Sequence, residues 1–246
     1  MNKAFLNKFF GKFGFEINGV SYMHQLRRNA ETKDVFVIQR EMLNGKANVI
    51  FDLGANYGSV TETYKREFPD STIYAFEPFP EIFKSLSEKT KQLKNVKVYD
   101  KAVTDSSGKR VFFVNENPDT NSLYKSQEAG LSSDKQAQNK YAIDVDAISI
   151  NDFCAQENIQ KIDILKMDIQ GGELGALKGA TRLLEKKQIS LIYLEAFFIP
   201  QYQNQPLFQD LLGFLFDNGY QLQDIYNPFY GKGSLAWCDA IFLPKR

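Results

Sequence analysis

Acidic and glycine residues that follow short apolar runs carry most of the recognisable chemistry of this 246-residue chain. The first group is Asp-Leu-Gly-Ala-Asn-Tyr-Gly at residues 52–58, directly after Val49, Ile50 and Phe51. Glycines let a backbone approach a ligand closely, and the start of a helix offers free N–H groups. An apolar strand, a glycine loop and a helix in this order predict a site for a small-molecule cofactor.

The loop pattern distinguishes between classes of cofactor. A dinucleotide site needs G-x-G-x-x-G and a P-loop needs Gly-Lys-Ser/Thr, and residues 52–58 match neither. A carboxylate at Asp52 suits a cationic group such as an amino-acid ammonium. Glu77 ends the next predicted strand, where an acidic residue can bind two ribose hydroxyls. An amino acid joined to a ribonucleoside without phosphates is S-adenosylmethionine, which the loop therefore predicts.

Alternating strands and helices must position these residues. Helical segments separate the first strands, which is typical of parallel βαβ units, so the strand ends that carry Asp52 and Glu77 should share one edge of the sheet. The final two strands predict an antiparallel hairpin. Strands are predicted at about 48–53, 72–76, 95–99, 110–114, 141–148, 162–167, 191–194, 220–226 and 236–243. Helices are predicted at about 30–44, 60–68, 79–93, 173–186 and 208–216.

We divide the chain into an N-terminal helical extension, residues 1–47, and one domain, residues 48–246. The aromatic and basic start of the extension could bind a membrane surface or a partner, but packing on the body or on another copy is favoured, which allows a homo-oligomer. The polar segment 115–140 is either a lid over a site or a plain surface loop. His24 is the single histidine, and a packed or surface role is favoured over a substrate-side base.

The overall composition excludes several classes. Lys plus Arg and Asp plus Glu are 30 each, which removes the charge signature of a general nucleic-acid binder. Cys154 and Cys238 have no ligand-like spacing and fit a reducing compartment. No apolar run approaches the roughly 20 residues of a membrane span, and the N-terminus does not match a signal peptide. We therefore expect a cytoplasmic protein without a transmembrane segment.

Several stretches together resemble one family. The loop at 52–58 with Glu77 resembles the signature of class I S-adenosylmethionine-dependent methyltransferases, and residues 48–243 resemble the FkbM family of O-methyltransferases. The stretches that carry the resemblance are 51–58, 75–78, 102–105, 164–173, 177–180, Glu195, Tyr202, 205–208 and 237–242. Gln170 departs from the commoner pattern, which has Glu, and this puts a catalytic carboxylate at 170 in doubt.

The resemblance implies a fold and a reaction. The fold is α/β, doubly wound, with a mostly parallel seven-stranded Rossmann-like sheet, helices on both faces and a C-terminal antiparallel hairpin. The reaction is methyl transfer from S-adenosylmethionine to a hydroxyl of a small molecule or glycan. The cofactor-binding candidates are Asp52, Gly54, Ala55, Asn56, Tyr57, Gly58, Glu77, Pro78, Lys101, Ala102 and Asp168, with adenine expected near residues 100–103.

An alcohol is a weak nucleophile, so a base or a metal must help to remove its proton. The catalytic candidates, from strand ends on the ligand edge, are Asp168, Glu195, Lys166 and Glu173. Three of them have a structural alternative: Asp168 as a helix cap, Glu173 as a first-turn residue, and Lys166 as part of an ion pair. Asp168 with Glu195 could hold Mg²⁺, although the sequence does not settle this.

Two further questions stay open in the sequence. An aromatic wall for a sugar could be formed by Tyr202, Tyr226, Phe229, Tyr230 and Trp237, although such residues are more often core. The function has two rivals, a nicotinamide-dependent oxidoreductase on a similar fold and a non-catalytic binding module that keeps the cofactor fold. The missing G-x-G-x-x-G argues against the first.

Overall fold

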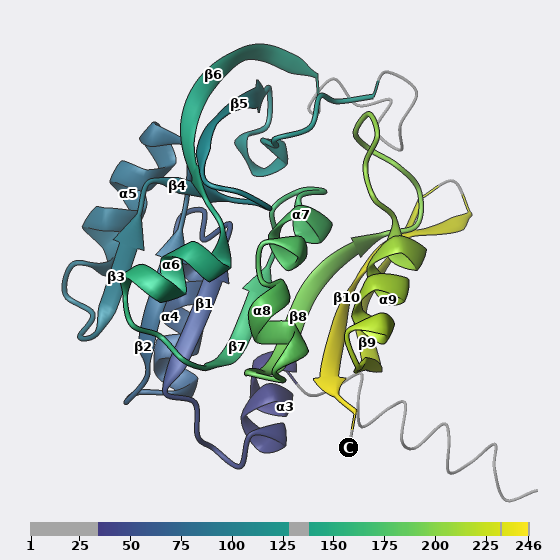
Figure 1. The fold of residues 1–246 in the computed structure, drawn as a ribbon. Coiled ribbons are helices and arrows are strands. Elements are labelled where there is room, and N and C mark those ends of the chain that lie inside the picture. Colours follow the sequence, from purple (N-terminus) through teal and green to yellow (C-terminus); the bar gives the residue numbers. More distant parts are fainter. Residues whose placement is uncertain (1–33, 128–137, 232, 246) are drawn as a thin grey trace, which may run out of the picture.

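The computed structural model describes residues 34–127, 138–231 and 233–245 (Figure 1). Five parallel strands form its centre: β1 (Val49–Leu53), β2 (Thr72–Phe76), β3 (Val96–Tyr99), β7 (Ile162–Met167) and β8 (Ile189–Phe197). An antiparallel hairpin, β9 (Tyr220–Gly231) and β10 (Ser234–Pro244), completes the sheet in the order β3-β2-β1-β7-β8-β10-β9. The predicted seven-stranded, mostly parallel sheet with a C-terminal hairpin is confirmed.

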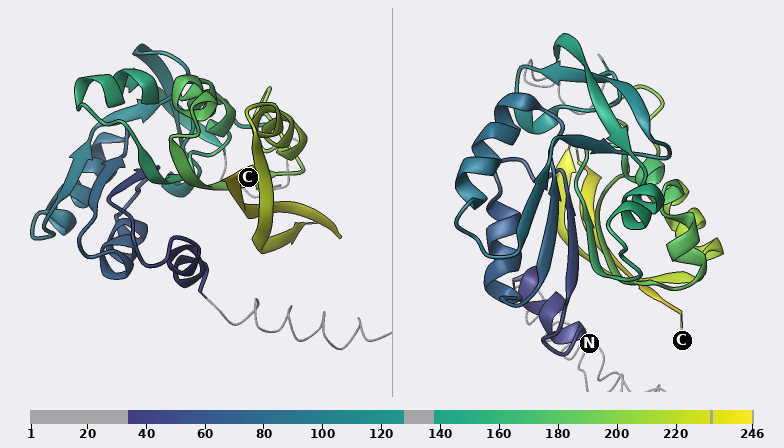
Figure 2. Two further views of the ribbon diagram at one scale, coloured as in Figure 1. Left: turned by 60° about the horizontal axis from the view of Figure 1, so that its bottom comes forward. Right: turned by 60° about the vertical axis from the view of Figure 1, so that its left-hand side comes forward.

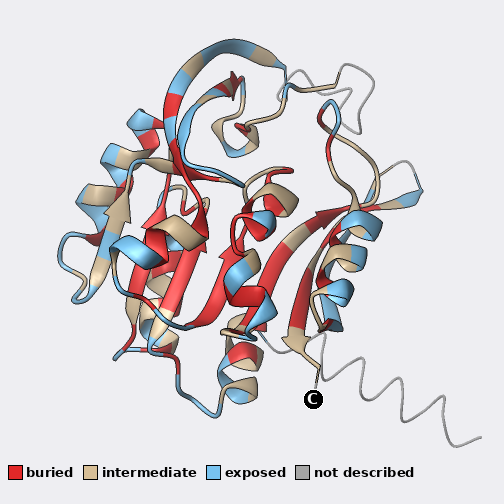
Figure 3. Ribbon diagram, viewed as in Figure 1, coloured by how far each residue is buried: buried red, intermediate tan, exposed pale blue. Residues whose placement is uncertain are grey.

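Continuous apolar runs place the central strands inside the molecule. All six residues of β7 are buried, and four of five are buried in β1 and in β2. Such runs are typical of parallel strands covered on both faces, because neither face meets water. Figure 3 shows these strands as the buried centre of the ribbon.

Helices cover both faces of the sheet (Figure 2). One face carries α3 (Val35–Met42), α4 (Ser59–Glu67) and α5 (Pro80–Thr90). The other carries α6 (Ile150–Gln156), α7 (Glu173–Lys178), α8 (Thr181–Glu185) and α9 (Phe208–Asp217). The two layers bury separate apolar clusters, so the sheet is held from both sides.

A second sheet lies over the carboxyl edge of the first, and sequence reasoning missed it. It joins β4 (Lys101–Val103), β6 (Asn139–Ile148) and β5 (Gly108–Asn115), in the order β4-β6-β5. The strands predicted at 110–114 and 141–148 are present, but they pair with each other. A short 3₁₀ helix, η2 (Pro118–Thr120), follows β5. Residues 128–137 of the predicted polar loop lie outside the described residues.

Two predicted elements have different bounds. The single helix expected at 173–186 is divided into α7 and α8 at Gly179, where a Cβ atom would lie 2.3 Å from the carbonyl oxygen of Thr104. The chain therefore packs backbone against backbone at this point. The closing hairpin extends beyond its predicted ends, and Phe229 and Trp237 stack across it with ring centroids 3.8 Å apart.

The N-terminal extension is described only from residue 34. Its helix α3 lies within the range predicted at 30–44, and Asp34 caps it by accepting a hydrogen bond from the N–H of Phe36 at 2.9 Å. The aromatic segment at 1–20 and His24 lie outside the described residues. Over the described ranges, we find no helix with the length and apolar character needed to cross a membrane.

Candidate active site

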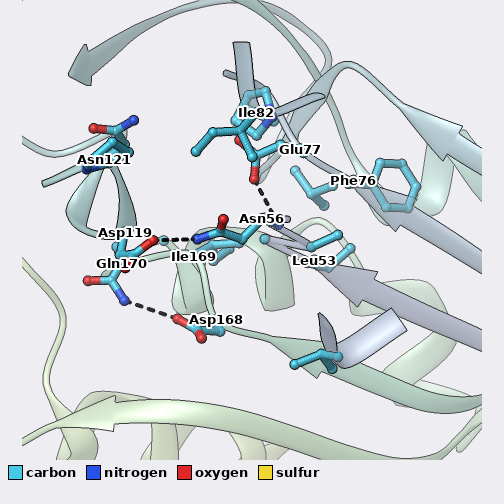
Figure 4. Close-up of a pocket in the computed structure, with 18 of the residues that line it drawn as sticks. Leu53, Asn56, Phe76, Glu77, Ile82, Asp119, Asn121, Asp168, Ile169 and Gln170 are labelled. Carbon is cyan, nitrogen blue, oxygen red and sulfur yellow. Dashed lines mark hydrogen bonds between the residues drawn. The ribbon is translucent and has the colours of Figure 1, made fainter. Parts of the chain in front are cut away.

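A cavity of about 500 Å³ opens where the strand order reverses, between β1 and β7 (Figure 4). The chain runs from β1 outwards to β3 and later returns to β7 on the other side of β1. Ligands bind at such reversal points in doubly wound folds, because the loops from adjacent strand ends diverge there. The ends of β1, β2 and β7 all contribute to the lining.

The glycine loop is shaped by close packing. Gly54 has a φ of +70°, and a Cβ atom there would lie 1.9 Å from the carbonyl oxygen of Asp168. The N–H groups of Gly54 and Ala55 donate to the carbonyl of Phe76 at 3.1 and 2.9 Å. These contacts hold the loop against the ends of β2 and β7, with Gly54, Ala55, Asn56 and Tyr57 on the cavity wall.

Gly58 has a different role from the one predicted. It does not line the cavity but precedes α4, with a φ of +81°. A Cβ atom there would lie 2.9 Å from Cδ1 of Leu86 on α5. The positive φ favours glycine at this position, and the packing of α4 on α5 adds to that preference.

Glu77 lies on the wall at the end of β2, as expected for a ribose-binding residue. Its Oε2 accepts the N–H of Asn56 at 3.1 Å, and its Oε1 accepts the N–H of Phe79 at 2.9 Å. Burial raises the pKa of Glu77 to about 7, against the lowering effect of these two hydrogen bonds. Pro78, Lys101 and Ala102 line the same region, where the sequence predicted them.

Asp52, predicted to contact the ligand, is not among the residues that line the cavity. Asp52 is fully buried behind the loop, 3.0 Å from the Nζ of Lys166, and accepts a hydrogen bond from Thr61 at 2.6 Å. Strand side chains alternate between faces, and Asp52 is paired in register with Lys166 on the neighbouring strand, so both reach the α4 side.

Lys166 is held in an ion pair, the structural alternative raised above. Its ammonium also donates to the carbonyls of Leu53 and Gly54 at 3.2 and 2.9 Å. Burial alone lowers the pKa of Lys166, but the carboxylates of Asp52 and Asp168 outweigh burial and raise it. Lys166 therefore stays charged and is unsuited to act as a base, although it lines the cavity.

Asp168 and Glu195 are brought together through Gln170. The Nε2 of Gln170 donates to the Oδ1 of Asp168 at 3.0 Å and to the Oε2 of Glu195 at 2.9 Å, while Tyr202 donates to its Oε1 at 2.8 Å. Asp168 is exposed on the cavity wall, and Glu195 lies behind Gln170. Burial, followed by the charges of Asp168 and Glu173, raises the pKa of Glu195 well above its ordinary value.

The backbone at Gln170 is unusual as well. Its φ is +54°, in the left-handed region that a non-glycine residue rarely adopts. The hydroxyl of Ser122 donates to the Gln170 carbonyl at 2.7 Å and helps to hold it there. Strained residues of this kind concentrate at functional sites.

Glu173 does not reach the cavity, contrary to its prediction as a catalytic candidate. It is 2% exposed, and its Oε1 accepts the N–H of Ile169 at 2.9 Å, which closes the turn before α7. Burial raises the pKa of Glu173 to about 7. The structural alternative, a first-turn residue, describes its position.

The polar segment after β5, for which the sequence left a lid over a site and a plain surface loop open, contributes one wall of the cavity. Its contributing residues are Pro118, Asp119, Asn121 and Leu123. The Nδ2 of Asn56 donates to Asp119 at 2.9 Å, so this segment touches the glycine loop directly (Figure 4). The buried apolar part of the lining, Ile82 and Phe112, was missed by sequence reasoning. The only available signal was the polar composition of residues 115–140.

The predicted aromatic wall is not assembled. Tyr202 is buried and hydrogen-bonds to Gln170 from behind, and Tyr226 belongs to the core. Phe229, Tyr230 and Trp237 belong to the hairpin and do not line the cavity.

A magnesium site at Asp168 and Glu195 finds no support in the geometry. Both carboxylates face the same amide N–H₂ donor of Gln170, an arrangement that a cation would have to displace. Within residues 34–127, 138–231 and 233–245, no cluster of three or more His, Cys, Asp or Glu side chains is arranged to hold a metal ion.

The sequence of the chain matches a family model described as the methyltransferase FkbM domain, over residues 52–222. The chain belongs to the FkbM methyltransferase family. It is 25% identical over 171 residues to 2-O-methyltransferase NoeI of Sinorhizobium fredii, covering 67% of each protein. It is 29% identical over 143 residues to Methyltransferase 1 of Beauveria bassiana, covering 53% of this chain and 57% of that relative.

The fold of this FkbM-family chain is also found in a solved structure. An FkbM methyltransferase from Methylobacillus flagellatus superposes with a TM-score of 0.51 at 16% identity, over 81% of this chain and 44% of that one. The chain thus spans somewhat more than half of Methyltransferase 1 and less than half of the solved protein.

The FkbM-family chain is a methyltransferase with S-adenosylmethionine as its cofactor, and the cavity fits this molecule. Gly54 leaves bare backbone on the wall, and Glu77 presents a carboxylate at the end of β2 where a ribose can bind. Ile82, Phe112 and Leu123 form an apolar part of the same lining, as is usual for a small-molecule site. No phosphate-binding cluster of backbone and lysine is needed for such a ligand.

Proposed function

We propose that this FkbM-family protein transfers the methyl group of S-adenosylmethionine to a hydroxyl oxygen of a small molecule or a sugar. The observation that carries the proposal is the continuity of one cavity, which joins the glycine loop and Glu77 to the exposed carboxylate of Asp168. The naming of one relative as a 2-O-methyltransferase supports oxygen as the methylated atom.

The side chains present suit a direct displacement. When bound, S-adenosylmethionine supplies an electrophilic methyl group. The hydroxyl oxygen forms the new bond to carbon as the carbon–sulfur bond breaks, and the hydroxyl proton passes to a carboxylate. Asp168 is our candidate for that carboxylate, since it is exposed on the wall and Gln170 fixes one of its oxygens. Glu195 would act through Gln170, and Lys166 would hold the loop.

Calorimetry tests the cofactor half of the proposal. We expect S-adenosylmethionine and S-adenosylhomocysteine to bind at micromolar concentration, and Glu77→Ala to weaken both by at least about tenfold because the ribose loses its carboxylate partner. Glu185→Ala, an exposed change on α8, is the matched control. Binding of NAD in place of both compounds would indicate the oxidoreductase alternative and overturn the proposal.

Methyl transfer from labelled S-adenosylmethionine to a panel of free sugars and phenols, followed by mass spectrometry, tests the catalytic half. Asp168→Asn keeps the size of the side chain and its contact with Gln170 but removes the base. We expect transfer to fall by about 10²–10⁴-fold while cofactor affinity changes little. Wild-type protein that binds the cofactor and methylates no hydroxyl compound in the panel would favour a binding module.

A further inference from the structure

The side of the cavity opposite the end of β1 is built from four polar residues, which we call the polar wall: Asp119, Asn121, Asp168 and Gln170. Figure 4 shows Asn121, Asp119 and Gln170 on the side away from Leu53 and Phe76. Asp119 and Asn121 come from the segment around η2, while Asp168 and Gln170 follow β7. The wall therefore combines two segments that are far apart in the sequence.

The hydrogen-bonding capacity of the polar wall is unevenly used. The donors of Gln170 are fully used, because both Nε2 hydrogens go to carboxylates. Asp168 and Asp119 each use Oδ1 for a protein amide, and within the described residues no donor reaches either Oδ2. Two carboxylate oxygens therefore remain for donors that a ligand brings.

Asn121 supplies the one unused donor. It is 8% exposed, and its Oδ1 accepts the N–H of Asn115 at 2.8 Å. Its buried Nδ2 has no partner among the described residues, and Asn121 is one of the residues that line the cavity. A buried amide N–H₂ without a partner costs free energy, so it indicates a ligand oxygen or nitrogen at this position.

The polar wall carries two exposed carboxylates, those of Asp119 and Asp168, and the nearest buried cation is Lys166, whose pKa Asp168 helps to raise. Within the described residues, no ion pair joins Asp119, Asp168 or the adjoining Glu195 to a lysine or arginine. Lys166 is already paired with Asp52, and Lys101 lies near enough to Asp146 to help lower the pKa of that carboxyl. An anionic ligand at the wall would meet the carboxylates of Asp119 and Asp168, while the two nearby lysines are already engaged with other carboxylates.

We infer that the polar wall is the subsite for the molecule that receives the methyl group. The wall selects a neutral or cationic substrate with many hydrogen-bond donors, such as a polyol or an amino sugar, and it rejects substrates that carry a carboxylate or a phosphate. Hydroxyl or ammonium groups of the acceptor donate to the free oxygens of Asp119 and Asp168. One oxygen of that substrate accepts a hydrogen bond from the side-chain N–H₂ group of Asn121. The inference rests on the proposed function and adds the charge class of the substrate to it.

Four probes on one sugar scaffold test the inference: methyl glucoside, glucosamine, glucuronate and glucose 6-phosphate. Binding to protein saturated with S-adenosylhomocysteine is measured by ligand-detected NMR. We expect the first two probes to bind at least about tenfold more tightly than the two anions. Equal or tighter binding of either anion, or no binding of any probe at millimolar concentration, would overturn the inference.

Two variants connect the selectivity to the wall. Asp119→Asn keeps the shape and removes one charge, so the preference for glucosamine over glucuronate should fall by about fivefold. Asp217→Asn, the same change at the exposed end of α9, should leave the ratio unchanged. Calorimetry with S-adenosylmethionine on the same samples distinguishes a failure of the inferred charge selectivity from a failure of the proposed function. If the protein binds the cofactor but prefers anionic probes, only the inferred selectivity is wrong. If the protein does not bind the cofactor, the proposed function is wrong as well.

Discussion

The ammonium of Lys166 lies 3.0 Å from the carboxylate of Asp52, and both side chains are buried between the sheet and α4. The same ammonium donates to the carbonyls of Leu53 and Gly54, at the point where β1 becomes the glycine loop. One buried cation from β7 thus holds the carboxyl end of β1 in place. The pair positions the cofactor loop from behind and does not itself contact a ligand through Asp52.

Replacing this cation should destabilise the fold. Lys166→Met keeps the length of the side chain but leaves the Asp52 carboxylate buried and unpaired, so we expect a loss of about 3–5 kcal/mol of unfolding free energy in urea denaturation. Lys161→Met breaks the pair with Asp163, where the lysine is 59% exposed, and should cost about 1 kcal/mol or less. Similar losses in the two variants would contradict the assigned role of Lys166.

Gly54 and Gly213 provide a matched pair of glycine-to-alanine changes. Gly54→Ala should cost more than about 2 kcal/mol and abolish cofactor binding, because its Cβ would clash with the Asp168 carbonyl and its φ is positive. Gly213→Ala, inside α9 with no atom within 4 Å, should stabilise by about 0.5–1 kcal/mol. Thermal unfolding and calorimetry give both numbers. Normal cofactor affinity in Gly54→Ala would show that the loop tolerates displacement.

The stability of the unliganded protein should fall as the pH rises towards 7. The folded-state pKa of Glu173 is about 7, above its ordinary value of 4.5, so the folded chain binds a proton that the unfolded chain has released. This contribution is present at low pH and is lost between about pH 4.5 and 7. Glu77 shifts in the same direction. Glu173→Gln should flatten the slope by up to about 1.4 kcal/mol per pH unit.

Urea titrations at four pH values between 5 and 8 measure that slope. Glu173→Gln keeps an oxygen for the N–H of Ile169, so the turn before α7 is preserved. Glu185→Gln, at an exposed position on α8, serves as the reference. An unchanged slope in Glu173→Gln would mean that this carboxyl is ionised in the folded protein.

Position 170 should be intolerant of a carboxylate. Gln170→Glu places a third carboxylate between Asp168 and Glu195, so it should destabilise by about 1–3 kcal/mol at pH 8 and recover towards wild type at pH 5, where a proton can restore one donor. Gln170→Met lacks donors at every pH and should not recover. Gln203→Glu, at an exposed position, is the control. A pH-independent loss in Gln170→Glu would refute the bridging role.

The elements of the main sheet were predictable because local pattern and final environment agree. Residues 162–167 form a continuous apolar run and become a strand buried on both faces. Glu77 and Asp168 were placed on the site because both directly follow strands, and parallel strands bring these positions to one edge. The fold and the cofactor half of the cavity followed from such local signals.

The remaining features depend on contacts between distant segments. Asp52 was assigned to the ligand because the sequence cannot show that Lys166, 114 positions later, faces it across a strand pair. The second sheet was missed because β5 and β6 pair across a long polar insertion with no periodicity. Asp119 and Asn121 were missed for the same reason, since only the folded insertion brings them to the cavity.

The polar wall and the cofactor half of the cavity come from different segments of the chain, and this affects how substrate preference can change within the fold. The cofactor half of the cavity comes from β1, β2 and the loops that follow them, while Asp119 and Asn121 come from the insertion carried by β5 and β6. Asp119 of this insertion also accepts a hydrogen bond from Asn56 of the glycine loop, so changes in the insertion should alter both what is methylated and how the methyl donor is held. Exchanging residues 116–123 between relatives should therefore change the acceptor preference and the cofactor affinity together.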